Sequence, residues 1–257
     1  MTLDRDAGGV ASSVAFGLIL IGDELLVGTR EDRHFRHFRE CLSERGHALR
    51  WCWILPDEPD LLSEQLAHSM AGADPVFVCG GIGATPDDHT RCAAATAAGV
   101  PLTRHEGAAA LIEGRFGAQA YPHRIRMADL PVGSDLIANP YNQIPGFVLR
   151  RHYFLPGFPE MAWPMAEAVL ERDYPGRSPP LRERSVLVRG VTESRLIPMM
   201  EQLAAESPQL KLFSLPRLGP EPSVQIGFRG HDGIDLAFAA LCELLTREGL
   251  PFDPGLD

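Results

Sequence analysis

The sequence CGGIGATPDDHT occupies residues 79–90, between an apolar run at 75–78 and an alanine-rich run that follows it. Its glycines, Gly80, Gly81 and Gly83, let the chain turn tightly and bring backbone N–H groups close to a ligand. A helix that starts behind such a turn adds a partial positive charge that favours anions. The segment therefore predicts a phosphate-binding loop after a buried strand, although it lacks the lysine of a P-loop.

The acidic end of this loop has two interpretations. Asp87 and Asp88 could hold a divalent cation against the phosphate, because carboxylate oxygens are typical ligands of such ions. Alternatively, Thr85 caps a helix that begins at Pro86, and Asp88 complements the helix dipole. Capping does not require the glycines, which favours a ligand site. The residues predicted to contact its ligand are Gly80, Gly81, Gly83 and Thr85.

Strands and helices alternate through the first part of the chain. The apolar runs at 14–21 and 49–55 are typical of strands in a parallel sheet, and a helix capped by Asp57 is expected after the second run. Ligands of such sheets bind beyond the carboxyl ends of the strands. Asp23 and Glu24, directly after the first run, are therefore expected to bind the ligand or a metal, the alternative being a solvated turn.

A hairpin is predicted within 146–155, and the sequence PGFP at 156–159 follows it. Gly157, next to Pro156, permits close approach of a ligand, and the helix that starts after it could bind a second phosphate. A tight turn between strand and helix is the alternative.

Three segments of the chain are predicted. Residues 1–13 are expected to be disordered, 14–174 to form an α/β domain, and 182–253 to form a small α+β domain with β-α-β-β-α order. The proline- and glycine-rich stretch at 174–180 is the expected linker.

Composition limits the partners. The 257 residues are 45% apolar and 23% charged, and the net charge of -10 opposes binding to nucleic acids or anionic membranes. A GxxG sequence at 227–230 follows a strand, so RNA binding through it is not expected. The five cysteines form no CxxC pair and are read as reduced core thiols, and no apolar run has the length of a membrane span. A cytoplasmic protein is expected.

Basic side chains give further candidates. His34 and His37 are one helical turn apart and could share a metal, but without a third ligand two solvated histidines are the favoured interpretation. Arg124 and Arg126 could neutralise a phosphate or form surface ion pairs. Of these residues, Arg126 is included in the predicted ligand site.

Six motifs occur in a fixed order and carry a family resemblance. They are IGDELL (21–26), GGIGATPDDHT (80–90), RMADLP (126–131), Asn139-Pro140, PGF (145–147) and LPGFPEM (155–161). Over residues 14–172 the chain resembles the molybdopterin-binding (MoaB/Mog-like) fold, in its competence/damage-inducible protein A branch. The resemblance implies a three-layer α/β domain with a mostly parallel sheet. GVTES (190–194) and the segments after it resemble the small KH-like α+β domain of that branch.

The resemblance implies two classes of function. The branch is associated with metal-dependent pyrophosphatase activity on ADP-ribose or related nucleotides, and this is the main hypothesis. The loop from Gly80 to Asp88 would hold phosphate, Asp88 and Asp87 would be catalytic, and Asp88, Asp23 and Glu24 would bind Mg²⁺, Mn²⁺ or Co²⁺. The alternatives are a molybdopterin-binding protein or transferase of molybdenum cofactor biosynthesis, and a non-catalytic ligand-binding module. A homo-oligomer is also implied.

The chain departs from the family pattern at four places. His34 stands where the family has asparagine, Ala84 replaces a usual proline, and His89 replaces an apolar residue. The sequence YNQI at 141–144 replaces a small, glycine-containing turn. Its bulkier side chains are expected to narrow the pocket.

Overall fold

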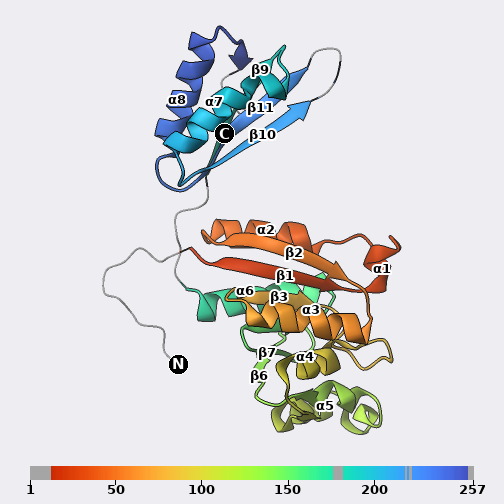
Figure 1. Ribbon diagram of the computed structural model, residues 1–257. Coiled ribbons are helices and arrows are strands. Elements are labelled where there is room, and N and C mark those ends of the chain that lie inside the picture. Colours follow the sequence, from red (N-terminus) through yellow and green to blue (C-terminus); the bar gives the residue numbers. More distant parts are fainter. Residues whose placement is uncertain (1–12, 176–181, 218, 220–221, 254–257) are drawn as a thin grey trace. The chain divides into compact units, whose positions relative to one another are not determined.

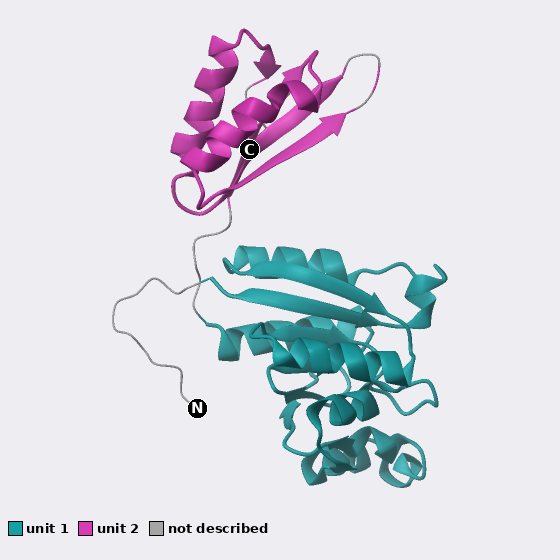
Figure 2. Ribbon diagram, in the orientation of Figure 1, with its two compact units in different colours: residues 1–178 teal, residues 179–257 magenta. Residues whose placement is uncertain are grey.

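The computed structural model describes residues 13–175, 182–217, 219 and 222–253. The chain divides into two compact units, residues 1–178 and 179–257 (Figure 2). Residues 1–12 of the predicted disordered N-terminus, and most of the predicted linker at 174–180, lie outside the described residues.

The first unit is built on a sheet with the strand order β2-β1-β3-β8-β7-β6 (Figure 1). The first four of these strands run parallel, and β7 pairs antiparallel with both β8 and β6, so the predicted mostly parallel sheet is confirmed. The strands are β1 (Ala15–Ile21), β2 (Ala48–Leu55), β3 (Val76–Cys79), β8 (His152–Leu155), β7 (Gly146–Leu149) and β6 (Asp135–Ile137).

Helices cover both faces of this sheet because its central strands are apolar on both sides. On β1, Leu18 and Leu20 pack against α2 (His34–Glu44) and α6 (Pro159–Asp173), whereas Ile19 packs on the opposite side. The second side is covered by α3 (Pro59–Ala71) and α4 (Thr90–Ala98). The remaining elements are α1 (Asp23–Leu26), β4 (Leu102–Arg104), α5 (Glu106–Phe116), the 3-10 turns η1 (Gly117–Ala120) and η2 (Arg124–Ala128), and β5 (Asp129–Pro131).

Two predicted helix starts are wrong. Helix α4 begins at Thr90 instead of Pro86, because the side chain of Asp88 hydrogen-bonds backward to the loop and residues 85–88 form a turn before the helix. Asp57 does not cap α3, whose N-cap is Glu58, and the carboxylate of Asp57 accepts a hydrogen bond from a different loop.

The second unit contains β9 (Arg182–Arg189), α7 (Glu193–Glu206), β10 (Lys211–Arg217), β11 (Ser223–Gly230), α8 (Ile234–Arg247) and β12 (Phe252–Asp253). Its antiparallel sheet has the order β10-β11-β9-β12, and a separate apolar core lies between this sheet and the two helices. The GxxG sequence at 227–230 lies inside β11 instead of a loop between helices. The KH-like assignment of this unit stays a prediction.

No helix in the described ranges has the length and apolar character needed to cross a bilayer.

Candidate functional site

The carboxyl ends of the four parallel strands open into one cleft of about 450 Å³. Glu24 lines it after β1, Asp57 after β2, the loop at 80–88 after β3, and Gly157 after β8. Residues between β6 and β7 also contribute to the lining. Two loops that sequence reasoning placed at one edge, 22–28 and 80–88, therefore meet as expected. The predicted site residues that line the cleft are Glu24, Gly80, Gly81, Gly83, Thr85, Asp87, Asp88, Pro156 and Gly157.

The glycine loop owes its shape to close packing. Gly80 and Gly81 have φ angles of 116° and 65°, a region that side chains rarely adopt. A Cβ atom on Gly80 would overlap the carbonyl oxygen of Ile21, and one on Gly81 would overlap the hydroxyl of Thr90. That hydroxyl donates to the Gly80 carbonyl at 2.9 Å. The loop is thereby held against the start of α4.

Three backbone N–H groups of the glycine loop are available to hydrogen-bond a ligand. Within the part of the chain that the structure describes, the N–H groups of Gly81, Ile82 and Ala84 have no hydrogen-bond partner. Unpaired backbone donors beside a helix start are suited to bind an anion.

Asp88 holds the loop together. Its Oδ1 accepts from the N–H of Gly83 at 2.9 Å, and its Oδ2 accepts from the N–H of Thr85 at 2.7 Å and from the Thr85 hydroxyl. Both carboxylate oxygens are therefore engaged in shaping the loop. The contact with the Thr85 N–H is the one expected of a capping arrangement, but it stabilises a turn before the helix, and metal binding by Asp88 stays a prediction.

Arg91 supports the loop from behind and was missed by sequence reasoning. Its side chain is buried, and its guanidinium donates to the carbonyls of Gly83 at 2.7 Å, of Asp129 at 3.0 Å, and of Arg126. Burial lowers the pKa of Arg91, but an arginine keeps its charge at neutral pH. A positive charge directly behind the glycine loop adds to its preference for an anion.

The cleft also has an acidic wall, in which Asp57 lies beside the glycine loop, because a Cβ atom on Gly81 would be 3.5 Å from Asp57 Oδ1. Asp23 and Asp57 are linked by reciprocal hydrogen bonds, in which each carboxylate accepts from the other residue's N–H at 3.1 Å. Asp23 itself is exposed and does not belong to the cleft lining, whereas Asp57 does. Burial raises the pKa of Asp57, and the negative charges of Asp23, Glu24 and Asp87 raise it further. This wall would attract a cation.

The predicted metal ligands Asp88, Asp23 and Glu24 are not gathered into a ready site. Across the described residues, one group of three ligand side chains has its ligating atoms within 4.8 Å of one another, and it consists of His37, Cys41 and Glu167. Because Asp23 and Asp88 hydrogen-bond to different loops, their carboxylates are held by separate parts of the cleft edge.

The arginine of the cleft is not the predicted one. Arg126 is exposed and absent from the lining, and Arg124 packs over the ring of Phe116 at 4.6 Å. Arg30 lies in the lining instead, 3.6 Å from Glu24 and over the ring of Phe158 at 5.1 Å. Its place in the loop after β1 is the signal that could have identified it.

Asn139 belongs to one of the six family motifs, but it was not among the residues predicted to bind the ligand. It is buried in the cleft lining, and its Oδ1 accepts from the N–H of Tyr141 at 3.0 Å. Its side-chain NH₂ group has no partner among the described residues. The bulky 141–144 segment enters the cleft only in part, because Asn142 and Ile144 line it while Tyr141 is 65% exposed.

The expectation of a solvated histidine is wrong for His34. Its ring is buried, and Nε2 donates to the carbonyl oxygen of Gly157 at 3.2 Å. Burial lowers the pKa of His34, which keeps the ring neutral at pH 7. His34 thereby connects α2 to the loop that carries Gly157 into the cleft.

A family model described as "probable molybdopterin binding domain" matches residues 17–177, which include the glycine loop and every residue of the cleft. The chain belongs to this family. Its cleft is thus a feature of a molybdopterin-binding-type domain, and the resemblance inferred from the motifs is confirmed.

Relatives of this family member agree with the assignment. A protein of Pyrobaculum calidifontis is 30% identical over 251 residues, covering 90% of this chain and 95% of the relative. A CinA-like protein of Citrifermentans bemidjiense is 32% identical over 76% of this chain, which spans 49% of that protein. The crystal structure of CinA, a protein of unknown function from Thermoplasma acidophilum, is 28% identical with a TM-score of 0.58, covering 63% of this chain and 98% of that one.

Proposed function

We propose that the cleft binds a phosphorylated pterin of the molybdopterin class. The observation that carries the proposal is the set of unpartnered N–H groups at Gly81, Ile82 and Ala84. A phosphate placed against them would accept these hydrogen bonds and gain from the charge of Arg91 behind the loop.

The rest of the cleft suits a flat heterocycle. Its volume of about 450 Å³ lies within the usual range of small-molecule sites. Ile82, Ile144 and Met161 supply apolar contacts, and the free NH₂ group of Asn139 could donate to a ring carbonyl or ring nitrogen. Phosphate and ring would thus be recognised by different parts of one cleft.

A fluorescence titration with molybdopterin tests this proposal. We expect saturable binding, and at least about tenfold weaker binding of the same pterin without its phosphate, because hydrogen bonds to a charged group contribute about 1.5–3 kcal/mol. Equal affinity for both compounds, or no saturable binding, would contradict the proposal.

A pair of variants locates the pterin. Asn139→Asp keeps the acceptor for the N–H of Tyr141 but replaces the NH₂ donor by a negative charge, so affinity should fall at least about tenfold. Gln143→Glu adds the same charge at an exposed position outside the cleft lining and should bind like the parent. Equal losses in both variants would point to a long-range effect of charge.

A second candidate function is metal-dependent hydrolysis of a nucleotide diphosphate such as ADP-ribose. The acidic wall favours it, because Mg²⁺, Mn²⁺ or Co²⁺ from solution could bridge the phosphates to Glu24, Asp57 or Asp87. Water would then add to one phosphorus while the P–O–P bond breaks, giving AMP and ribose phosphate. In this version Asp57 takes the role that sequence reasoning assigned to Asp88.

Incubation with ADP-ribose, FAD and NAD in the presence of each metal tests the second function. Appearance of AMP would support this function if the rate of AMP formation falls at least about a hundredfold in Asp57→Asn. Glu58→Gln, at the exposed neighbouring position, is the matched control. If ligand binding is saturable but no substrate is hydrolysed, the remaining functions are molybdopterin binding and non-catalytic binding of another ligand.

A further inference from the structure

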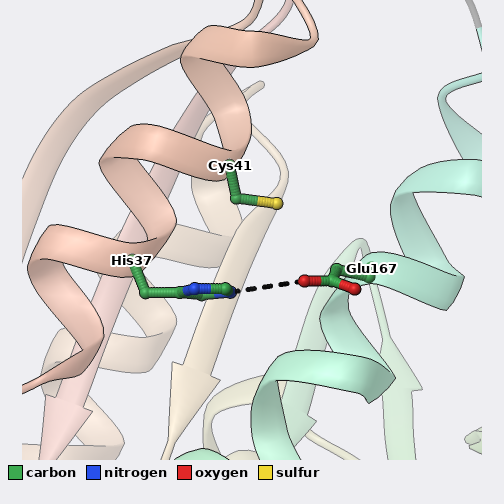
Figure 3. A group of neighbouring side chains, drawn as sticks. All are labelled: His37, Cys41 and Glu167. Atoms are coloured by element: carbon green, nitrogen blue, oxygen red, sulfur yellow. Dashed lines mark ion pairs between the residues drawn. The ribbon is translucent and has the colours of Figure 1, made fainter.

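A group of three ligand-type side chains lies where α2 packs on α6, apart from the cleft lining (Figure 3). His37 and Cys41 are one turn apart on α2, and Glu167 faces them from α6. The Nε2 atom of His37 and a carboxylate oxygen of Glu167 are 3.8 Å apart, and all ligating atoms of the three residues lie within 4.8 Å of one another. The side chains converge on one small space.

The contacts within this group of three residues leave one buried nitrogen atom without a hydrogen bond. Nε2 of His37 is buried without a hydrogen-bond partner in the described part of the chain, because 3.8 Å to Glu167 is too long for one. The ring cannot easily turn away, since Trp163 stacks on it with 4.1 Å between ring centroids. A buried, unpaired and oriented nitrogen is costly unless a further atom binds to it.

The thiol of Cys41 is prepared to act as a ligand. Its side chain is buried, and Arg45 donates to its sulfur at 3.0 Å, a contact that stabilises a thiolate. A cation that binds the sulfur would displace the thiol proton into solvent. A neutral imidazole of His37 would offer the lone pair of Nε2 to the same cation.

We propose that His37, Cys41 and Glu167 form a binding site for a Zn²⁺-class divalent cation. Nitrogen, thiolate and carboxylate are the ligand types of zinc sites, whereas a thiolate is a poor ligand for Mg²⁺ or Ca²⁺. The three protein ligands leave one tetrahedral position for water. Glu167, whose side chain is 45% exposed, provides the opening to solvent.

Such a cation would join α2 to α6. One turn earlier on α2, His34 already contacts the Gly157 carbonyl of the cleft. The metal would therefore stabilise the helix pair that holds this side of the cleft, and bound metal should raise the melting temperature by mass action.

Titration of the metal-free full chain with Co²⁺ tests the proposal. Coordination by a thiolate gives a near-ultraviolet charge-transfer band that carboxylate ligands of the cleft cannot produce. We expect one Co²⁺ per chain, loss of the band on adding Zn²⁺, and no loss on adding excess Mg²⁺. These readouts do not depend on any activity of the cleft, so they can fail or succeed separately from the proposed function.

Two ligand variants with matched controls complete the test. Cys41→Ser should abolish the band, and Glu167→Gln should weaken Co²⁺ binding at least about tenfold, since even loss of a residue that only supports a ligand costs that much. Cys92→Ser and Glu171→Gln, at exposed positions, should behave like the parent. Melting temperatures without metal check that each variant is folded.

The opposite results would overturn the proposal. These are a parental chain without the band, a band that survives Cys41→Ser, or folded Glu167→Gln that binds Co²⁺ as tightly as Glu171→Gln.

Discussion

The two ends of the parallel sheet differ in whether nearby polar groups have hydrogen-bond partners. At the carboxyl end, the loop after β3 leaves the N–H groups of Gly81, Ile82 and Ala84 without partners among the described residues. At the amino end, the buried ring of His152 at the start of β8 has partners at both nitrogens, because it contacts Ser69 of α3 at 2.8 Å and the Arg150 carbonyl at 3.1 Å. One end of the sheet is therefore available for binding, and the other contributes to stability.

The same contrast holds beside β3. Asp74, just before this strand, accepts hydrogen bonds from Arg50 at 3.0 Å and from the indole of Trp51 at 3.2 Å. Just after the strand come glycines, which have no side chains to pair. A molecule that binds a ligand must leave groups unsatisfied somewhere, and here they gather at the end where parallel sheets bind ligands.

The largest effect is expected at Gly81. Gly81→Ala must place a Cβ at a φ of 65° and against the Thr90 hydroxyl, so it should lower the free energy of unfolding by about 2–5 kcal/mol and abolish pterin binding. Gly99→Ala is a matched control, because its φ is 66° but no atom lies within 4 Å of the added Cβ. It should cost only about 1–2 kcal/mol and leave binding intact. Denaturant unfolding measures the stability of the two variants, and the binding titration measures their pterin affinity. Equal losses of stability in Gly81→Ala and Gly99→Ala would mean that the loop is not tightly packed.

The second prediction concerns pH and the amino end. Burial lowers the pKa of His152 from its usual 6.5 to about 4, so the unfolded chain binds a proton more readily than the folded one between these values. Stability is therefore complete above pH 6.5 and falls by up to about 3 kcal/mol as the pH drops to 4. His152→Gln should be less stable at neutral pH, but its free energy of unfolding should depend less steeply on pH, because the contribution of His152 is gone. Melting curves from pH 4 to 7 check it, and an unchanged slope would exclude His152 as the cause.

A smaller effect is expected for Asp88→Asn. The amide can still accept from one N–H of the loop, but it loses the second acceptor for Gly83 or Thr85 and the negative charge, so we expect a loss of about 1–2 kcal/mol and weaker ligand binding. Any hydrolytic rate should fall no more than binding does, because Asp88 shapes the loop. Loss of turnover by a hundredfold with normal binding would instead support the predicted role of Asp88 as a metal ligand.

The smallest effect is expected for Arg50→Gln at the amino end. The arginine side chain is 62% exposed, so its ion pair with Asp74 should contribute under about 1 kcal/mol and be screened by salt. Pterin affinity should not change. A variant that bound the pterin less tightly would show that the two ends of the sheet are coupled.

Much of the fold could be predicted because its signals are local. Continuous apolar runs at 14–21 and 75–78 predict buried parallel strands, and the glycines after the second run predict a loop with backbone donors. The predicted helix from Thr85 failed for a physical reason. Capping residues also favour turns, and the contact of Asp88 with Gly83, five positions earlier, stabilises the turn instead.

By itself, the sequence determined the strand and helix order, the place of the cleft beyond the strand ends, and the family. Only the tertiary structure decided which side chains act there. Neither the motif that contains Asn139 nor the spacing of His37 could show what these side chains contact, and Arg91, Cys41 and Glu167 were not singled out, because the role of each depends on burial and on contacts between elements that are distant along the chain. Backbone conformation follows from neighbouring residues, whereas the satisfaction of a polar group depends on whatever the fold packs against it.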